Sequence, residues 1–414
     1  MKGNSVMKNR AKSNLVAIIL IIVLLFSLYM VLFSVTKNDG INRLFMHSSY
    51  DSYTLQAIQW REGRIKLDKD YPWLELAIYE GDYYVSFPPV PAIPMYFLTY
   101  IFGSLTPSNA VVMVYNMIAF IFAFLCCRRM EANVFNSILG ACFTCIASAC
   151  LFLSMSGGVW FMAQILAICL TLAAMYFMLG ESKKGWHAGM FLLALSVGCR
   201  PFQILYFVFF IFLLFKRYEF KILRTWKYFI LPGIVAISYM VYNYIRFDNI
   251  FEFGHNYLPE FTRDYPGNYG KFNIRYVPEQ FKAFFKEHPK LTKNGLEYNQ
   301  FGFTFYISNV IFILLAVAII FFIFKSIRNR DKSNIAEVAI LFVLVCIHIF
   351  LMLMHRTTGA WQFGARYMAD IVPGALLCIL YCKNVLYKKA YTPVLFLLSF
   401  GMALNIFGAT AMYL

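Results

Sequence analysis

The chain has 414 residues, of which 60% are hydrophobic and only 14% are charged. Soluble domains carry about a quarter charged residues, so this composition excludes an ordinary soluble protein and predicts an all-α polytopic membrane protein. We attribute the net charge of +16 to basic residues in cytoplasmic segments, which orient a membrane protein, and we predict no nucleic-acid partner.

The first predicted span runs from Leu15 to Val35 behind a cluster of basic residues, and no small-residue cleavage site follows it. We therefore expect an uncleaved helix and a cytoplasmic N-terminus. Eleven spans are predicted in a single transmembrane domain covering residues 1–414, which places the C-terminus outside. The remaining ten are 108–127, 134–154, 159–180, 187–199, 201–215, 228–245, 304–324, 335–354, 368–382 and 391–412.

One apolar run, Pro89 to Gly103, either crosses the membrane or lies along its outer surface. If it does not cross, the short cytoplasmic segments hold 20 of the 37 basic residues and only five of the 21 acidic ones. Making it a span moves sixteen of those twenty basic residues outside, against the positive-inside rule. We therefore expect it to stay on the outer face.

Two long outer segments remain, residues 36–107 and 246–303. The first begins after the first span with the run from His47 to Asp51, followed by a helical pattern from Tyr50 to Glu62 that Gly63 ends. Ser48 or Ser49 is expected to cap this helix. Asp51 is either an acid stabilised by the helix dipole or a catalytic residue. We expect two surface helices here, joined by an aromatic loop.

A basic residue stands at each of two helix ends on the outer side. Arg200 precedes Pro201 between two apolar stretches too short to span alone, which predicts a broken helix with the arginine facing an anion or extending to lipid headgroups. Arg246 ends the seventh predicted span. Beyond it, residues 276–287 are predicted as an amphipathic surface helix, and nearby lysines are available to headgroups: Lys282, Lys286, Lys290 and Lys293.

The last outer loop, residues 355–370, contains His355, Arg356, Arg366 and Asp370. The i,i+4 spacing of Arg366 and Asp370 allows a structural ion pair. His348 lies within a span and is interpreted as a core histidine.

The ten cysteines fall in or at the ends of spans, so no disulfide is predicted. Cys142 and Cys145 have metal-like spacing, but no second pair accompanies them, and we interpret them as a small apolar face. No zinc motif, triad or phosphate-binding glycine loop is present. The sequence therefore predicts no metal and no cofactor.

The order of these features resembles the GT-C glycosyltransferases, in particular the branch of the protein O-mannosyltransferases and the aminoarabinose transferase of lipid A. The resemblance covers most of the chain in organisation. It is carried by Tyr50 to Gly63, Phe87 to Pro91, Asn243 to Tyr257 and Trp361 to Pro373. It implies that a sugar is moved from a polyprenyl-phosphate carrier to an acceptor glycan, lipid or protein on the outer face of the cell membrane, with inversion.

The resemblance places the catalytic acid at Asp51, acting as a general base. Phosphate leaves with developing negative charge, which arginine stabilises well. Arg200, Arg246 and Arg366 are the candidates, followed by Arg356 and His355. Related enzymes often carry a further acid between the third and fourth spans, where this chain has residues 154–158 without one. Candidates for an acceptor-binding residue or second acid are Glu62, Asp82, Glu252 and His255.

Two other functions are compatible with a basic polytopic chain. A flippase or transporter of lipid-linked sugars typically has charges near the membrane midplane and internal repeats, and neither pattern is found here. A scaffold for envelope assembly requires no catalytic Asp51. The glycosyltransferase reading is therefore preferred.

Overall fold

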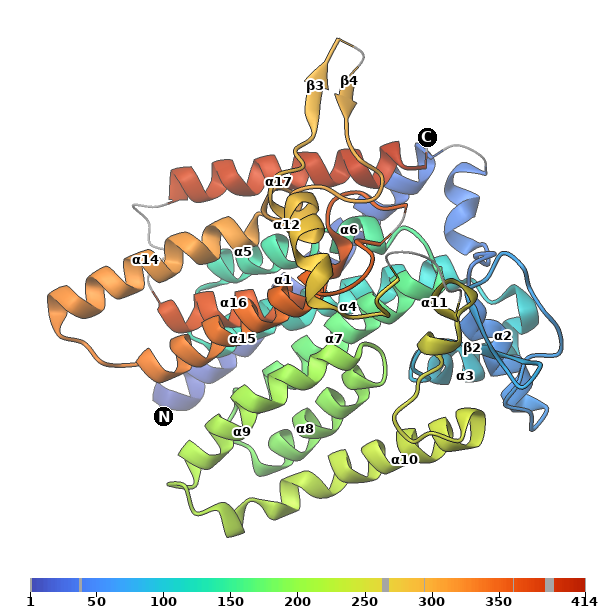
Figure 1. Ribbon diagram of the computed structural model, residues 1–414. Helices are drawn as coiled ribbons and strands as arrows, with labels where there is room; N and C mark the ends of the chain where they lie inside the picture. Colours follow the sequence, from blue (N-terminus) through green and yellow to red (C-terminus); the bar gives the residue numbers. More distant parts are fainter. Residues whose placement is uncertain are drawn as a thin grey trace.

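The computed structural model describes residues 2–36, 39–262, 268–293, 295–359, 361–383 and 391–413. Within them the chain forms a bundle of helices, and strands occur only in two short hairpins (Figure 1). The bundle helices are α1 (Lys2–Ser34), α4 (Ser108–Arg129), α5 (Val134–Cys145), α6 (Cys150–Leu153), α7 (Val159–Met178), α8 (Lys183–Val197), α9 (Leu205–Arg217), α10 (Ile230–Phe247), α14 (Ile311–Asn329), α15 (Ile335–Leu353), α16 (Val372–Cys382) and α17 (Tyr391–Ala411).

The segments between these helices hold shorter elements. The α-helices are α2 (Ser52–Arg61), α3 (Ala92–Phe102), α11 (Pro259–Thr262), α12 (Val277–Phe285) and α13 (Phe305–Ser308). The hairpins pair β1 (Leu76–Tyr79) with β2 (Asp82–Val85) and β3 (Lys290–Thr292) with β4 (Gly295–Glu297). The 3-10 turns are η1 (Gly40–Phe45), η2 (Gly103–Leu105), η3 (Pro201–Ile204), η4 (Ile222–Arg224), η5 (Trp226–Phe229), η6 (His255–Tyr257), η7 (Ile274–Tyr276) and η8 (Arg366–Ile371).

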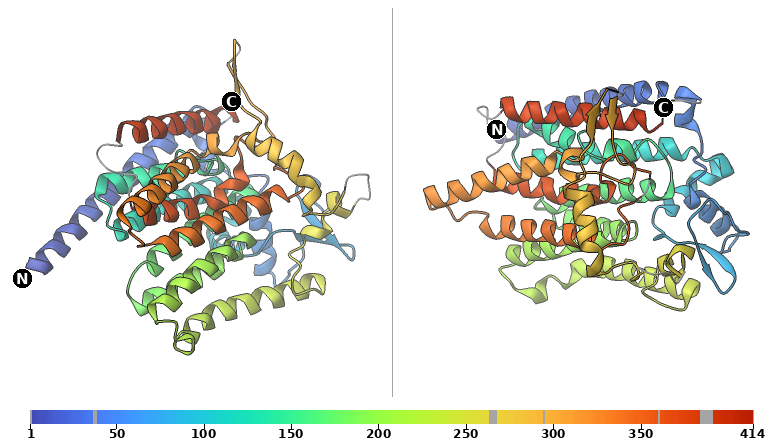
Figure 2. Two further views of the ribbon diagram at one scale, coloured as in Figure 1. Left: turned by 60° about the vertical axis from the view of Figure 1, so that its left-hand side comes forward. Right: turned by 45° about the horizontal axis from the view of Figure 1, so that its top comes forward.

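Seven helical stretches in the described residues are long and apolar enough to cross a membrane. The chain is therefore a multi-pass membrane protein, as predicted. The other four predicted spans coincide with α5, α8, α9 and α16, which have only 11 to 15 residues. Eleven crossings thus remain a prediction, although the two termini lie at opposite ends of the bundle, as an odd number requires (Figure 2).

Helix α7 forms the centre of the bundle. It packs between α4 and α8. Of the most apolar 18-residue stretch of this helix, 83% is buried, as expected for a helix that is hydrophobic on all sides. The corresponding figure for the stretch containing α10 is 17%, which leaves most of that helix facing the surroundings of the protein. Helix α16 packs against both α14 and α15 and completes the other half of the bundle.

Two predicted continuous spans are broken. The predicted span 134–154 divides into α5 and α6, and 304–324 divides into α13 and α14. The Asn309 side chain joins the breaks: its Oδ1 accepts a hydrogen bond from Ala149 N (2.9 Å), and its Nδ2 donates to Phe305 O (3.1 Å). Broken backbone is tolerated at this depth because neighbouring protein groups satisfy the freed amides and carbonyls.

The two long segments, 36–107 and 246–303, gather at the end of the bundle opposite the N-terminus, which we call the loop end (Figure 2, left). Helices α2 and α3 pack against each other there. The predicted aromatic loop between them contains the hairpin β1–β2, because Glu80 and Gly81 both have positive φ and form a tight turn that returns the chain. At 11 residues, α3 is about 16 Å long, as short as α16, so the location of residues 89–103 on the outer face remains a prediction from the charge distribution.

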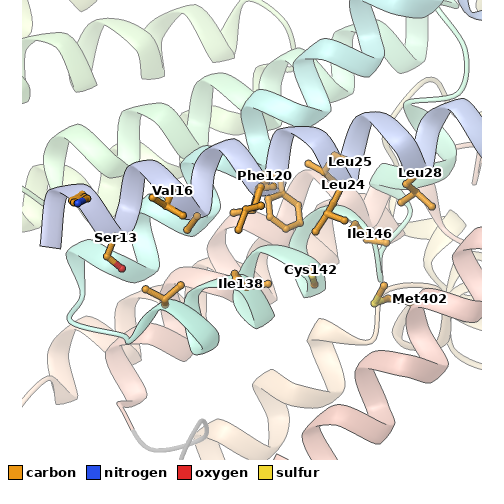
Figure 3. A pocket seen from close by; sticks show the side chains of 15 residues that line it. Ser13, Val16, Leu24, Leu25, Leu28, Phe120, Ile138, Cys142, Ile146 and Met402 are labelled. Atoms are coloured by element: carbon orange, nitrogen blue, oxygen red, sulfur yellow. The ribbon is translucent and has the colours of Figure 1, made fainter. Parts of the chain in front are cut away.

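An apolar groove of about 800 Å³ runs along α1 on the side of the bundle (Figure 3). Leu24 of α1, Phe120 of α4, Ile138 of α5 and Met402 of α17 contribute to its wall. Its surface is almost wholly hydrocarbon, which suits contact with membrane lipid. None of the predicted site residues lines it.

Candidate functional site

Asp51 is the N-cap of α2. Its Oδ1 accepts a hydrogen bond from Thr54 N (3.1 Å), and its Oδ2 accepts one from Thr54 Oγ1 (2.6 Å). The prediction that Ser48 or Ser49 caps this helix is therefore wrong, because the helix begins at Ser52 and only Asp51 stands directly before it. Ser48 Oγ instead accepts from Tyr50 N (3.4 Å).

The Asp51 carboxylate is enclosed by protein, with the residue only 1% exposed. Burial raises the pKa of Asp51, and this shift is opposed by the nearby His47 ring and by the hydrogen bonds from Thr54. His47 Nδ1 lies 3.6 Å from Asp51 Oδ2. A carboxylate with a raised pKa is a stronger base than one at the protein surface, which suits proton abstraction.

Arg200 lies in the predicted helix break, between the end of α8 and η3. Its Nε donates to Asp370 Oδ2 (2.9 Å), and the other Asp370 oxygen, Oδ1, accepts from Gln164 Nε2 (3.1 Å). The Asp370 side chain is fully buried, whereas the Arg200 side chain is 18% exposed. The ion pair therefore fixes the arginine at the break while part of its side chain stays accessible.

The alternative ion pair between Arg366 and Asp370 is not formed. Residues 366–371 make the 3-10 turn η8, in which side chains three apart are aligned and those four apart are not. Asp370 pairs with Arg200 instead.

Arg366 is held in its loop by a hydrogen bond and by close packing. Its backbone N donates to Gln362 Oε1 (3.0 Å), and its guanidinium lies 4.7 Å from the centroid of the Tyr367 ring. Gly359 (φ 95°) passes so close that a Cβ there would lie 2.8 Å from Arg366 Nε. That Nε is buried and has no hydrogen-bond partner among the described residues. An anion at this position would satisfy it.

The guanidinium of Arg246 donates hydrogen bonds to two other parts of the protein. Nη1 donates to Val85 O (2.9 Å) and Nη2 to Asn243 Oδ1 (3.0 Å), and the residue is 1% exposed. It thus attaches β2 to the end of α10. These contacts occupy both terminal nitrogens, whereas the Arg246 Nε is buried without a hydrogen-bond partner among the described residues.

The remaining predicted residues differ in their surroundings. Glu62 pairs with Arg64, and Asp82 Oδ1 pairs with Lys66 Nζ (3.0 Å), both at exposed positions. No hydrogen bond or ion pair joins either acid to Asp51 in the described part of the chain. Glu252 is buried and accepts a hydrogen bond from Gly254 N (2.6 Å), which shapes the loop before η6.

Arg356 Nη1 donates to Glu260 O (2.7 Å). His255 and His355 lie near the arginines. The His255 ring contacts Phe87 with 5.6 Å between centroids, and the His355 ring contacts Tyr367, whose ring also faces Arg200, at 5.2 Å. Burial lowers the pKa of His355 to about 4, and nearby cations contribute to the shift. Both histidines are therefore neutral near pH 7, since the pKa of His255 is also well below its ordinary value.

Lys271 and Glu75 also belong to this region, although no local sequence pattern distinguishes them. Burial lowers the pKa of Lys271 to about 8, with a further contribution from Arg200. The Glu75 Oε2 accepts from Trp160 Nε1 (2.7 Å) at the start of α7. Glu75 thus brings a carboxylate beside the loop 154–158, where the sequence has no acid.

The described residues contain no group of three or more His, Cys, Asp or Glu side chains arranged to hold a metal ion. All ten cysteines are free. The titratable side chains gathered here are a buried carboxylate, Asp51, and several cations.

No protein-family model matches the sequence, and no curated protein matches it. Solved structures share its fold. The Archaeoglobus fulgidus oligosaccharyltransferase, crystallised with a tethered acceptor peptide containing the NVT sequon, is 13% identical with a TM-score of 0.54 and covers 97% of this chain. ArnT from Cupriavidus metallidurans in the apo state is 11% identical with a TM-score of 0.51 and covers 93%.

This chain in turn spans 55% of the oligosaccharyltransferase and 62% of ArnT. Both proteins are GT-C glycosyltransferases, so the predicted GT-C fold is confirmed. At this level of identity the likeness concerns the fold.

Proposed function

We propose that this protein is a membrane glycosyltransferase that moves a sugar from a polyprenyl-phosphate carrier to an acceptor on the outer face of the cell membrane. One observation carries the proposal: on a GT-C fold, a buried carboxylate and a group of cations lie at the loop end. Tyr53 is buried two residues after Asp51, in a position where the charges of Asp51, Arg200 and Arg246 all act on it.

In the proposed reaction, Asp51 takes the proton from an acceptor hydroxyl. The acceptor oxygen then attacks the anomeric carbon, and the bond from that carbon to the carrier phosphate breaks with inversion. A general base of this kind contributes roughly 10² to 10⁴ in rate. Because Asp51 is only 1% exposed, the loop around it has to open before an acceptor reaches it.

The carrier phosphate gains negative charge as it leaves, and positive groups stabilise that charge. Arg200 is positioned by Asp370, and Arg366 has an unsatisfied Nε. Lys271 adds a third charge below pH about 8. We assign these three side chains to the phosphate. Arg356 and Arg246 remain secondary candidates because their observed hydrogen bonds hold Glu260 and Val85.

The outer-face location rests on the distribution of charge. The segments expected in the cytoplasm carry most of the basic residues, and the proposed site lies at the loop end, opposite the N-terminus. Membrane lipid is a second proposed partner, because the sides of the bundle are apolar.

The test is mass spectrometry of polyprenyl-linked sugars and surface glycans in cells with and without the gene. Loss of the gene should cause one lipid-linked sugar to accumulate and one surface glycan to lose that sugar. An Asp51→Asn copy of the gene should fail to restore the glycan, whereas the wild-type copy should restore it. Unchanged glycans together with lipid-linked sugar confined to the inner leaflet would support a flippase instead.

A further inference from the structure

Four aromatic side chains lie near Glu75: Trp160 donates a hydrogen bond to it, Tyr50 packs on Trp160, and Tyr71 and Trp73 come shortly before it in the chain. We call Tyr50, Tyr71, Trp73 and Trp160 the aromatic rim. The rings of Tyr50 and Trp160 are 5.8 Å apart between centroids, and those of Tyr71 and Trp73 are 5.7 Å apart. Tyr50 is 47% exposed and Trp73 is 57% exposed, so large aromatic surfaces are open beside the candidate catalytic residue.

The protein itself fixes the rim. Trp73 Nε1 donates to Ser49 O (3.1 Å), and Trp160 Nε1 donates to Glu75 Oε2 (2.7 Å). Val159 N donates to Tyr50 O (2.9 Å), which ties the start of α7 to the same point. Tryptophans that anchor a protein at a membrane surface direct the indole N–H toward water and headgroups. Here both N–H groups are used internally, so anchoring does not explain their orientation.

Glu75 adds a hydrogen-bond acceptor to this surface. Its Oε2 is used by Trp160, and no hydrogen bond to its Oε1 is observed among the described residues. The surrounding protein raises the pKa of Glu75, with a smaller contribution from the charge of Glu260, while the Trp160 hydrogen bond and Arg366 act in the opposite sense. The Glu75 carboxylate disfavours an anionic group in direct contact with it.

We propose that the aromatic rim and Glu75 form the acceptor subsite and that the acceptor is a neutral saccharide. The ring carbons of a pyranose present C–H faces that pack on aromatic side chains, while its hydroxyls donate hydrogen bonds to a carboxylate. Tyr50 is adjacent to Asp51 in the chain, so a sugar on the rim brings a hydroxyl toward the proposed base. This inference rests on the proposed function, because it assigns a substrate class to the same site.

The experiment uses the full chain in lipid nanodiscs and the neutral oligosaccharides released from the cell envelope of the source organism. Binding is followed by saturation-transfer difference NMR in the wild type and in Trp73→Ala, Glu75→Gln and Trp226→Ala. Glutamine keeps an oxygen to accept the Trp160 N–H. Trp226 is a matched control because it is 58% exposed and precedes α10, far from the end of that helix that approaches the site.

Trp73→Ala should weaken saccharide binding about five- to tenfold, and Glu75→Gln about tenfold, while Trp226→Ala leaves it unchanged. The proposal is overturned if the wild type binds no saccharide in the pool, if Trp73→Ala binds as the wild type does, or if a peptide digest of the envelope binds and the saccharides do not.

A separate assay with the polyprenyl-phosphate-linked sugar distinguishes this inference from the proposed function. Rim-dependent saccharide binding without consumption of the donor would overturn the transferase function and leave a saccharide-binding site. Transfer to a peptide or to a lipid phosphate, unaffected by Trp73→Ala, would overturn the saccharide subsite and leave the transferase function in place.

Discussion

Arg200 and Asp370, 170 residues apart in the sequence, form an ion pair with 2.9 Å between Arg200 Nε and Asp370 Oδ2. The pair connects the break between α8 and α9 to η8, which leads into α16. Gln203 Nε2 (3.3 Å) in η3 and Tyr206 OH (3.0 Å) in α9 both donate to the Asp370 carbonyl oxygen, so the break and the helix that follows it hold the same residue. This arrangement gives Arg200 a structural partner while part of its side chain remains exposed.

We predict that Arg200→Leu lowers both stability and carrier affinity. Removing one member of a buried pair leaves an uncompensated charge on Asp370, which costs about 3 to 5 kcal/mol in unfolding free energy. Loss of one charge-assisted contact should weaken binding of a polyprenyl-phosphate analogue roughly 10- to 150-fold. Thermal unfolding and analogue titration in detergent measure the two effects.

The double variant Arg200→Leu with Asp370→Asn separates the effect on stability from the effect on carrier affinity. It removes the uncompensated charge, so much of the stability should return while carrier affinity stays low. Recovery of affinity along with stability would show that Arg200 has only a structural role.

We predict that Ser182 and Asn268 lie on opposite sides of the membrane. Ser182 precedes α8 in a segment expected in the cytoplasm, and Asn268 belongs to the second long segment at the loop end. In a background with the native cysteines replaced, an impermeant thiol reagent added outside should label Asn268→Cys and not Ser182→Cys. Labelling of both from the same side contradicts the topology and the outer location of the site.

Much of the fold is predictable because hydropathy and charge act over whole segments. The long spans and the break at Arg200 follow from stretches of 10 to 20 residues in which each residue contributes to the same signal. Arg200 is predicted at a helix break because two short apolar stretches meet there, whereas the resemblance places the catalytic acid at Asp51; both roles remain predictions.

The contacts between distant segments were not predictable. Glu75 and Lys271 lie in polar stretches with no periodic pattern, and only the packing of the loops places them near Trp160 and Arg200. The Arg366–Asp370 pair that the i,i+4 spacing allows is not formed, because that spacing brings side chains together in an α-helix and residues 366–371 form a 3-10 turn. Helix type depends here on tertiary contacts that single-sequence spacing does not contain.

We predict that donor use declines as pH rises through the pKa of Lys271, which is about 8. Its charge is present below that pH and lost above it, so kcat/KM for the carrier-linked sugar should fall above pH about 8. The free energy of unfolding should rise between pH about 8 and 10.5, because in this range the unfolded chain binds more protons at Lys271 than the folded chain does. The measurement is a pH profile of initial rates alongside thermal unfolding.

Lys271→Arg is the matched variant for this prediction. Arginine remains charged throughout the range, so the decline above pH 8 should disappear. If kcat/KM falls above pH about 8 in Lys271→Arg just as it does in the wild type, Lys271 does not act on the donor phosphate.

The last prediction concerns Asp51, which the structure shows to be a helix cap and which we propose to be the catalytic base. Asn caps a helix about as well as Asp, so Asp51→Asn should keep α2 while removing the base. The variant should fold, insert and bind the carrier analogue, and transfer should fall at least about a hundredfold. Asp51→Ala serves as the comparison, because it removes the cap as well and should cost about 1 kcal/mol more in stability.

The pH dependence gives an independent check on the same residue. Burial raises the pKa of Asp51, and only its deprotonated form accepts a proton, so the wild-type rate should rise with pH through that pKa. His47 opposes the shift, and His47→Gln should move this acidic limb to higher pH. If Asp51 were only a cap, transfer would change little in Asp51→Asn and the acidic limb would remain. Retention of more than about a third of wild-type transfer by purified Asp51→Asn, an effect below 1 kcal/mol, would exclude the catalytic assignment.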